Sequence, residues 1–144
     1  MNQLPIIDIA PLYTDDQSAW QSVASQIDHA CREWGFFYIK GHPISPSRIE
    51  AVLDSAKQFF ALPTTEKLQI DITQTRHHRG YGAIATEQLD PGRPSDLKET
   101  FDMGLHLPDD HPDVLAEKPL RGPNRHPAIP GWEPLLEQHY LDMQ

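Results

Sequence analysis

The sequence predicts an α+β fold whose elements run strand, helix, strand, helix from the N-terminus. Two short runs rich in β-branched or aromatic residues, 5–9 and 36–40, are each followed by a stretch in which apolar residues recur every three or four positions. The runs are typical of strands, and the recurring spacing is typical of helices with one apolar face. With 144 residues the chain fits one domain, 1–144.

The first strand is predicted at residues 5–9, because its isoleucines favour extended structure and prolines flank it. A helix is expected after Asp15 and Asp16, which suit a helix start, and Gly35 ends it. Cys31 lies on the apolar stripe of this helix. We therefore expect its thiol to pack in the core rather than act as a nucleophile.

The second strand is predicted at residues 36–40, which show no polar alternation and so favour a strand covered on both faces. The second helix is expected from Ser45, its cap, to Phe60. A short helix through Leu68 and a polar loop over 73–82 complete this half of the chain.

A third strand is predicted at residues 98–103, where alternation places Glu99 and Phe101 on one face and Lys98 on the other. Seven prolines between 108 and 134 predict an extended surface connection. An amphipathic helix at about 131–144 reaches the last residue without a capping glycine. We expect the chain to be truncated within this helix.

Composition excludes several classes of protein. The net charge of −9 would repel a nucleic-acid backbone. No apolar run approaches the roughly 20 residues that cross a bilayer, and the N-terminus lacks the features of a secretion signal. A single cysteine allows no internal disulfide, which favours a cytoplasmic location.

Short motifs occur in a characteristic order along nearly the whole chain. They are LPIIDI at 4–9, ACREWGFFYI at 30–39, GH at 41–42, FFALP at 59–63 with Lys67, HRGYG at 78–82 and KETFD at 98–102. In this order they resemble the N-terminal domain of the isopenicillin N synthase-like family of iron(II)- and 2-oxoglutarate-dependent oxygenases.

The resemblance implies a jelly-roll core that holds iron(II) by two histidines and an aspartate and 2-oxoglutarate by an arginine and a serine. These groups belong to the family's C-terminal half. The jelly roll should therefore be largely absent from this chain, which should contain no catalytic or metal residue and, alone, bind neither cofactor. The whole protein is expected to oxidise a small, carboxylated metabolite, with the isolated chain inactive.

Four residues are candidates for binding that substrate: Arg79, Tyr81, Glu99 and Phe101. A guanidinium group offers paired donors to a carboxylate, and the glycines around Tyr81 let the backbone bend close to a ligand. The resemblance places the loop at the substrate cavity and implies that the face shared by Glu99 and Phe101 looks into the active site.

His111-Pro112-Asp113, with His126 or His139 as third ligand, has the composition of a metal site. We reject this interpretation, because Pro112 removes a ladder donor and the region is rich in proline. His126 also stands where the family resemblance predicts an aromatic residue, which makes the path of the connection less certain.

The alternative function is a non-catalytic module derived from such an oxygenase, which binds a small molecule or another protein. A partner chain or self-association would then cover the apolar C-terminal helix.

Overall fold

The computed structural model of the protein describes residues 3–85, 92 and 95–144. The chain divides into two compact units, Met1–Ile44 and Ser45–Gln144. Each unit has a two-stranded sheet and a core of its own, so the prediction of an α+β fold is confirmed for the described residues, with small sheets only. Within those ranges no helix has the length and apolar character needed to span a membrane.

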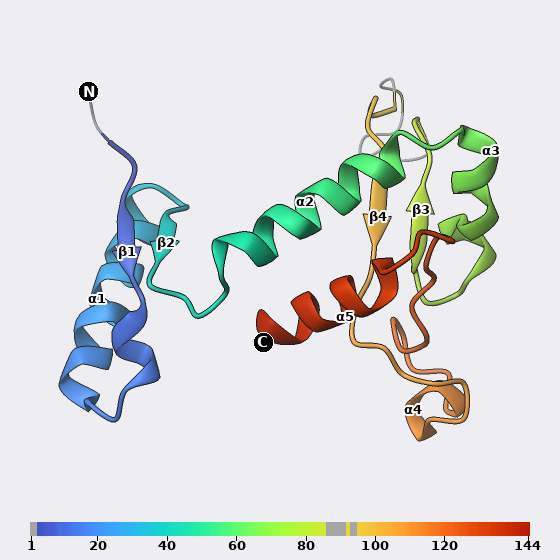
Figure 1. Ribbon diagram of the computed structural model, residues 1–144. Helices are drawn as coiled ribbons and strands as arrows, with labels where there is room; N and C mark the ends of the chain where they lie inside the picture. Colours follow the sequence, from blue (N-terminus) through green and yellow to red (C-terminus); the bar gives the residue numbers. More distant parts are fainter. Residues whose placement is uncertain (1–2, 86–91, 93–94) are drawn as a thin grey trace. The chain divides into compact units, whose positions relative to one another are not determined.

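The N-terminal unit is a strand–helix–strand motif (Figure 1). Its elements are β1 (Ile6–Asp8), η1 (Ala10–Tyr13), α1 (Gln17–Glu33) and β2 (Tyr38–Lys40). The two strands are parallel, with Ile7 opposite Ile39, and α1 supplies the crossover that parallel neighbours need. The Asp16 carboxylate caps α1 as expected, accepting the amides of Ser18 at 2.9 Å and Ala19 at 3.2 Å.

The core of this unit is small, and two predictions fail beside it. Its buried residues are Ile7, Val23 and Ala30. Cys31 is exposed, because one residue step turns the helix by about 100° away from Ala30. The run 36–40 is a strand only at Tyr38–Lys40, and all three of its residues are exposed. One α-helix, the only one in the described part of this unit, cannot cover both faces of the pair.

The C-terminal unit joins helices to an antiparallel strand pair. Its elements are α2 (Pro46–Phe60), α3 (Thr64–Lys67), η2 (Leu68–Ile70), η3 (Ile72–Gln74), β3 (Gly80–Gly82), β4 (Thr100–Asp102), α4 (Pro112–Leu115) and α5 (Trp132–Asp142). Tyr81 lies opposite Phe101 in the strand pair. Ser45 caps α2 by accepting the amide of Arg48 at 3.2 Å, as the sequence predicts.

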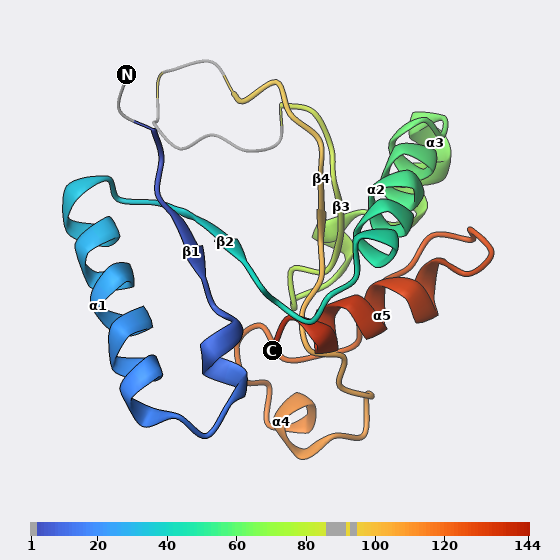
Figure 2. The ribbon, with the colours of Figure 1, turned by 60° about the vertical axis from the view of Figure 1, so that its left-hand side comes forward.

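The core of this unit lies where α2 and α5 pack against the strand pair (Figure 2). Phe59 is fully buried at its centre. Its ring centroid is 5.4 Å from that of Phe101 and 5.2 Å from that of Trp132, and the Phe101 and Trp132 rings meet edge to face. Such pairs add about 0.5–1.5 kcal/mol each beyond their burial. The aromatic cluster therefore holds α2, β4 and α5 together.

The proline-rich connection is only partly extended. Turns at 109–110, 116–117 and 119–120 and the short helix α4 interrupt it, so the prediction of an extended segment over 108–134 is wrong for that part. Pro112 occupies the first turn of α4, where a missing N–H costs nothing, and His111 is its cap. The predicted final helix is confirmed as α5. It begins after Gly131, whose backbone is in the left-handed region with φ of 78°.

Candidate functional site

An ammonium group, a carboxylate and a phenol meet beside the core of the C-terminal unit. Lys67 Nζ is ion-paired with Glu99 Oε2 and donates to the carbonyl oxygen of Phe60 at 3.1 Å. The Tyr81 hydroxyl donates to the same Glu99 oxygen at 2.7 Å. Lys67 and Tyr81 are buried, and the Glu99 side chain is 24% exposed. We call these three residues the lysine network; it links α3, β3 and the residue that precedes β4.

The network shifts the titration of both of its acids. The Lys67 ammonium, and after it the Tyr81 hydroxyl, hold the pKa of Glu99 below its ordinary value of 4.5. Burial, and after it the Glu99 carboxylate, raises the pKa of Tyr81 to about 12. At neutral pH the network therefore contains one cation, one anion and a neutral phenol, each with a partner.

Arg79 is held by backbone carbonyls. Its Nη1 donates to the carbonyls of His77 at 3.0 Å and His78 at 3.2 Å, and its Nη2 donates to Leu120 at 2.9 Å. A Cβ on Gly104 would collide with the guanidinium, so the backbone approaches it closely there. Arg79 is 9% exposed and ties the polar loop to the connection at Leu120. Contact of Arg79 with a substrate carboxylate stays a prediction.

The two faces of the strand pair have different surroundings. Tyr81 and Phe101 point into the core, whereas the opposite face lines an open hollow of about 540 Å³. The hollow is lined by Ile72, Thr73, His78, Gly82, Lys98, Thr100 and Asp102. The predicted alternation is therefore confirmed, with Phe101 and Thr100 on different faces. None of the four predicted substrate residues lines the hollow.

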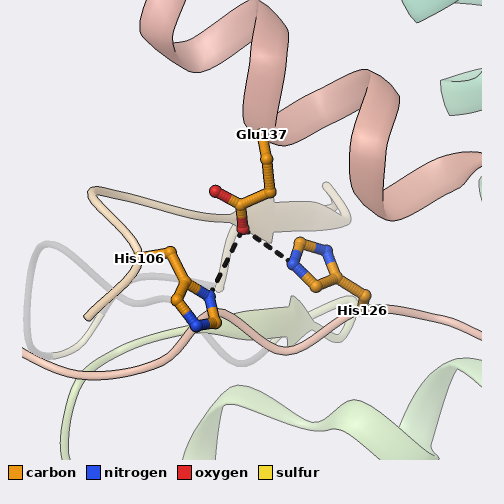
Figure 3. Close-up of side chains that lie close together, drawn as sticks. All are labelled: His106, His126 and Glu137. Carbon is orange, nitrogen blue, oxygen red and sulfur yellow. Dashed lines mark hydrogen bonds and ion pairs between the residues drawn. The ribbon is translucent and has the colours of Figure 1, made fainter. Parts of the chain in front are cut away.

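Two imidazoles and a carboxylate converge in the same unit (Figure 3). His126 Nε2 lies 2.8 Å, and His106 Nδ1 3.6 Å, from Glu137 Oε1. The side chains of His126, Glu137 and His106 are 10%, 22% and 40% exposed. Glu137 projects from α5, and both histidines come from the connection between β4 and α5. We call this group the histidine cluster.

Asn124 holds the histidine cluster from the buried side. Its side chain accepts the amide of Gly104 at 2.9 Å and donates to the Gly104 carbonyl at 2.6 Å. The same amide nitrogen donates to Glu137 Oε1 at 2.8 Å. Asn124 is 7% exposed and joins the carboxylate to the backbone of Gly104.

His111 and Asp113 serve the short helix α4. His111 Nδ1 accepts the amide of Asp113 at 3.1 Å, and Asp113 is ion-paired with Lys118 at 2.6 Å. The Lys118 ammonium holds the pKa of Asp113 below its ordinary value. Neither residue belongs to the histidine cluster, which is the candidate metal-ligand group that the described residues contain.

Comparison with known proteins identifies the family. A family model described as "non-haem dioxygenase in morphine synthesis N-terminal" matches residues 4–129. This chain belongs to that family. The resemblance carried by the sequence motifs is thereby confirmed, as is the interpretation of the chain as an N-terminal part of an iron(II)- and 2-oxoglutarate-dependent oxygenase.

Curated oxygenases of this family match nearly the whole chain. Clavatol oxidase claD of Penicillium crustosum is 35% identical over 98% of this chain and 46% of its own length. A homoarginine-6-hydroxylase of Arabidopsis thaliana is 38% identical over 94% of this chain and 40% of its own length. The chain thus spans less than half the length of these relatives.

Solved oxygenase structures show the same fold. A putative 2OG-Fe(II) oxygenase family protein of Caulobacter crescentus has a TM-score of 0.74 at 27% identity, covering 99% of this chain and 44% of that one. A full-length Neurospora crassa protein, solved with alpha-KG and thymine, has a TM-score of 0.73 at 25% identity, covering 99% and 46%. The described residues therefore form the N-terminal part of a known oxygenase architecture.

Sequence reasoning missed Lys67 as a partner of Glu99, and it missed the histidine cluster. Lys67 was part of a motif but carried no predicted role, and Glu99 lies 32 residues further along the chain. His126 gave the one available signal, as the departure from an expected aromatic residue. His106 and Glu137 had no local pattern that could have marked them.

Proposed function

We propose that this chain is the N-terminal, substrate-side part of an oxygenase that uses iron(II) and 2-oxoglutarate to oxidise a small, carboxylated metabolite. The match to the family over residues 4–129 carries the proposal. The relatives support the substrate class, since two of them are named for the hydroxylation of homoarginine, an amino acid. The structures solved with alpha-KG support the cofactor.

The described residues do not fit iron together with 2-oxoglutarate. A histidine–histidine–carboxylate set could hold iron(II). However, 2-oxoglutarate would also need an arginine beside the metal, and Arg79 is engaged with carbonyls while Arg125 donates to Gln69. We therefore propose that the ligands of both cofactors lie outside this chain, and that the chain alone does not turn over.

The four predicted substrate residues have internal partners, which supports a role in shaping the substrate side. Tyr81 and Phe101 pack in the core, and Glu99 is bound by Lys67. In the complete protein, Arg79→Lys should raise KM more than it lowers kcat if the loop that Arg79 holds borders the substrate. A change in kcat alone would contradict that role.

The test is an anaerobic titration of the purified 144-residue chain with iron(II) and 2-oxoglutarate, with a full-length relative as positive control. We expect the relative to develop the visible charge-transfer band of the chelated complex and the chain to show none. After admission of oxygen, the chain should release no succinate. A band or succinate from the chain would overturn the proposal that the ligands lie elsewhere. The activity of the complete protein is tested separately, by assaying the succinate that it releases from 2-oxoglutarate. If the complete protein releases no succinate, the non-catalytic module is favoured.

A further inference from the structure

We infer that His106, His126 and Glu137 form a binding site for a divalent transition-metal ion of the Zn²⁺ type. This site is separate from the iron site that the family resemblance places in the C-terminal half. The inference rests on the geometry of the histidine cluster, on the direction of its hydrogen bonds and on the way the fold anchors each ligand.

The three ligand atoms are close enough to share one ion. His106 Nδ1, His126 Nε2 and Glu137 Oε1 all lie within 4.8 Å of one another. Ligands bound to Zn²⁺ at about 2.0–2.2 Å in a tetrahedral arrangement lie roughly 3.3 Å apart. The observed distances to Glu137 Oε1, 2.8 Å and 3.6 Å, fall on either side of that value. Shifts of about half an ångström would therefore bring the pairs with Glu137 to a metal-binding geometry.

The contacts of His106 direct a lone pair into the cluster. The backbone N–H of Asn124 points at His106 Nδ1 at 3.4 Å, so this nitrogen acts as an acceptor. It also faces the Glu137 carboxylate oxygen at 3.6 Å. Two acceptors that face each other repel, unless a cation lies between them. A divalent ion would satisfy both acceptors and would replace a long, weak hydrogen bond.

The polar partners of Glu137 are an amide and two imidazoles. Its oxygen accepts from Asn124 and contacts two imidazoles, and within the described ranges it has no ion pair with lysine or arginine. His126 makes one polar contact among those residues, toward Glu137, since its Nδ1 is buried without a hydrogen-bond partner. Imidazole nitrogen and carboxylate oxygen are the donors that Zn²⁺ takes in proteins.

The fold anchors the ligands before any ion arrives. Glu137 follows Leu136, which is buried in the core, so α5 fixes its position. The backbone at His106 bridges to Gly122, and Asn124 orients the carboxylate from behind. Hydrogen bonds behind the ligands are typical of metal sites. His106 is 40% exposed, which gives solvent access to complete the coordination.

The first test is calorimetric titration of the 144-residue chain with Zn²⁺ alone, in a Cys31→Ser background that removes the exposed thiol. We expect one ion per chain. Glu137→Gln keeps the shape and the acceptor oxygen but loses the charge, and it should weaken the affinity at least about tenfold. The matched control is Glu133→Gln, an exposed residue on the same helix, which should bind like the parent. Equal affinities in the two variants, or no binding by the parent, would overturn the inference.

A second measurement needs no variant and guards against misfolding. Diethyl pyrocarbonate modifies accessible, uncoordinated imidazoles, and mass spectrometry locates the label. Zn²⁺ should suppress the labelling of His106 at least about tenfold, in line with occupancy of the site. The exposed His29 on α1 should be labelled equally with and without the ion. Loss of label at both histidines would show non-specific binding, and loss at neither would show an empty cluster; either result would overturn the assignment.

Discussion

The lysine network and the histidine cluster are each centred on one carboxylate of the C-terminal unit, and they differ in what surrounds it. Glu99 is bound by an ammonium and a phenol, whose side chains are buried. Glu137 is bound by an amide and two imidazoles, one of which is 40% exposed. One carboxylate has a lysine partner, and the other has an amide and two imidazoles, whose nitrogens are potential metal ligands.

This difference assigns the two groups to different tasks. Removing one partner of a buried ion pair is costly. An open set of imidazole and carboxylate donors can exchange a proton or water for a metal ion. The lysine network therefore fastens the strand pair to α3, and the histidine cluster is available for binding.

The largest effect should follow from removing the cation of the lysine network. Lys67→Met should lower the free energy of unfolding by about 3 kcal/mol, because Glu99 then keeps its charge in a partly buried place with no cation beside it. Urea unfolding of the C-terminal unit measures it. Lys57→Met, which removes an exposed ammonium paired with Asp54, should cost less than about 0.5 kcal/mol. Similar losses of unfolding free energy in Lys67→Met and Lys57→Met would show that the lysine network does not stabilise the fold.

The next effect should come from the carboxylate itself. Glu99→Gln should cost about 2 kcal/mol near neutral pH, since Lys67 loses its anion. The folded pKa of Glu99 is lowered, so its contribution is present above the ordinary value of 4.5 and is lost as the pH falls through the folded pKa. Unfolding curves from about pH 7 to about pH 3 should therefore converge for the parent and the variant. A constant difference across that range would contradict the pairing.

A smaller effect is expected at the phenol. Tyr81→Phe should cost about 1.5 kcal/mol, the value of a hydrogen bond to a charged group. The folded pKa of Tyr81 is raised to about 12, so its contribution is complete below the ordinary value of 10.0 and is lost as the pH rises through about 12. Lys67 is present in both the parent and the Tyr81→Phe variant. The difference between their unfolding free energies at alkaline pH therefore measures the contribution of the Tyr81 hydroxyl. A parent no more sensitive to alkali than the variant would refute this assignment.

The smallest effect should be found at Glu137 in the absence of metal. Glu137→Gln should change the free energy of unfolding by less than about 0.5 kcal/mol, because the amide oxygen still accepts from Asn124 and His126. Thermal unfolding with a chelator present checks it. With Zn²⁺ added, only proteins that keep the Glu137 carboxylate should be stabilised, since a ligand bound to the native state raises its stability. If Glu137→Gln lowered the free energy of unfolding as much as Glu99→Gln does, the proposed difference between the histidine cluster and the lysine network would be wrong.

Local patterns were sufficient for most of the fold. The α+β class, both caps at Asp16 and Ser45, the two long helices and the alternation at 98–103 all follow from spacing within a few residues. Local patterns failed to predict burial in the N-terminal unit. Cys31 and all three residues of β2 are exposed, because the described part of this unit has no second layer to cover them. The spacing of hydrophobic residues predicts which face of an element should be buried. Whether another element covers that face depends on the tertiary fold.

By itself the sequence determined the order of elements and the family, since periodicity, caps and ordered motifs are properties of neighbouring residues. Only the tertiary structure decided that Glu99 meets Lys67, and that His126 joins His106 and Glu137 rather than His111 and Asp113. The physical reason is that such contacts join elements far apart in the chain. Their distances are set by the packing of α3, α5 and the strand pair, which no local spacing encodes.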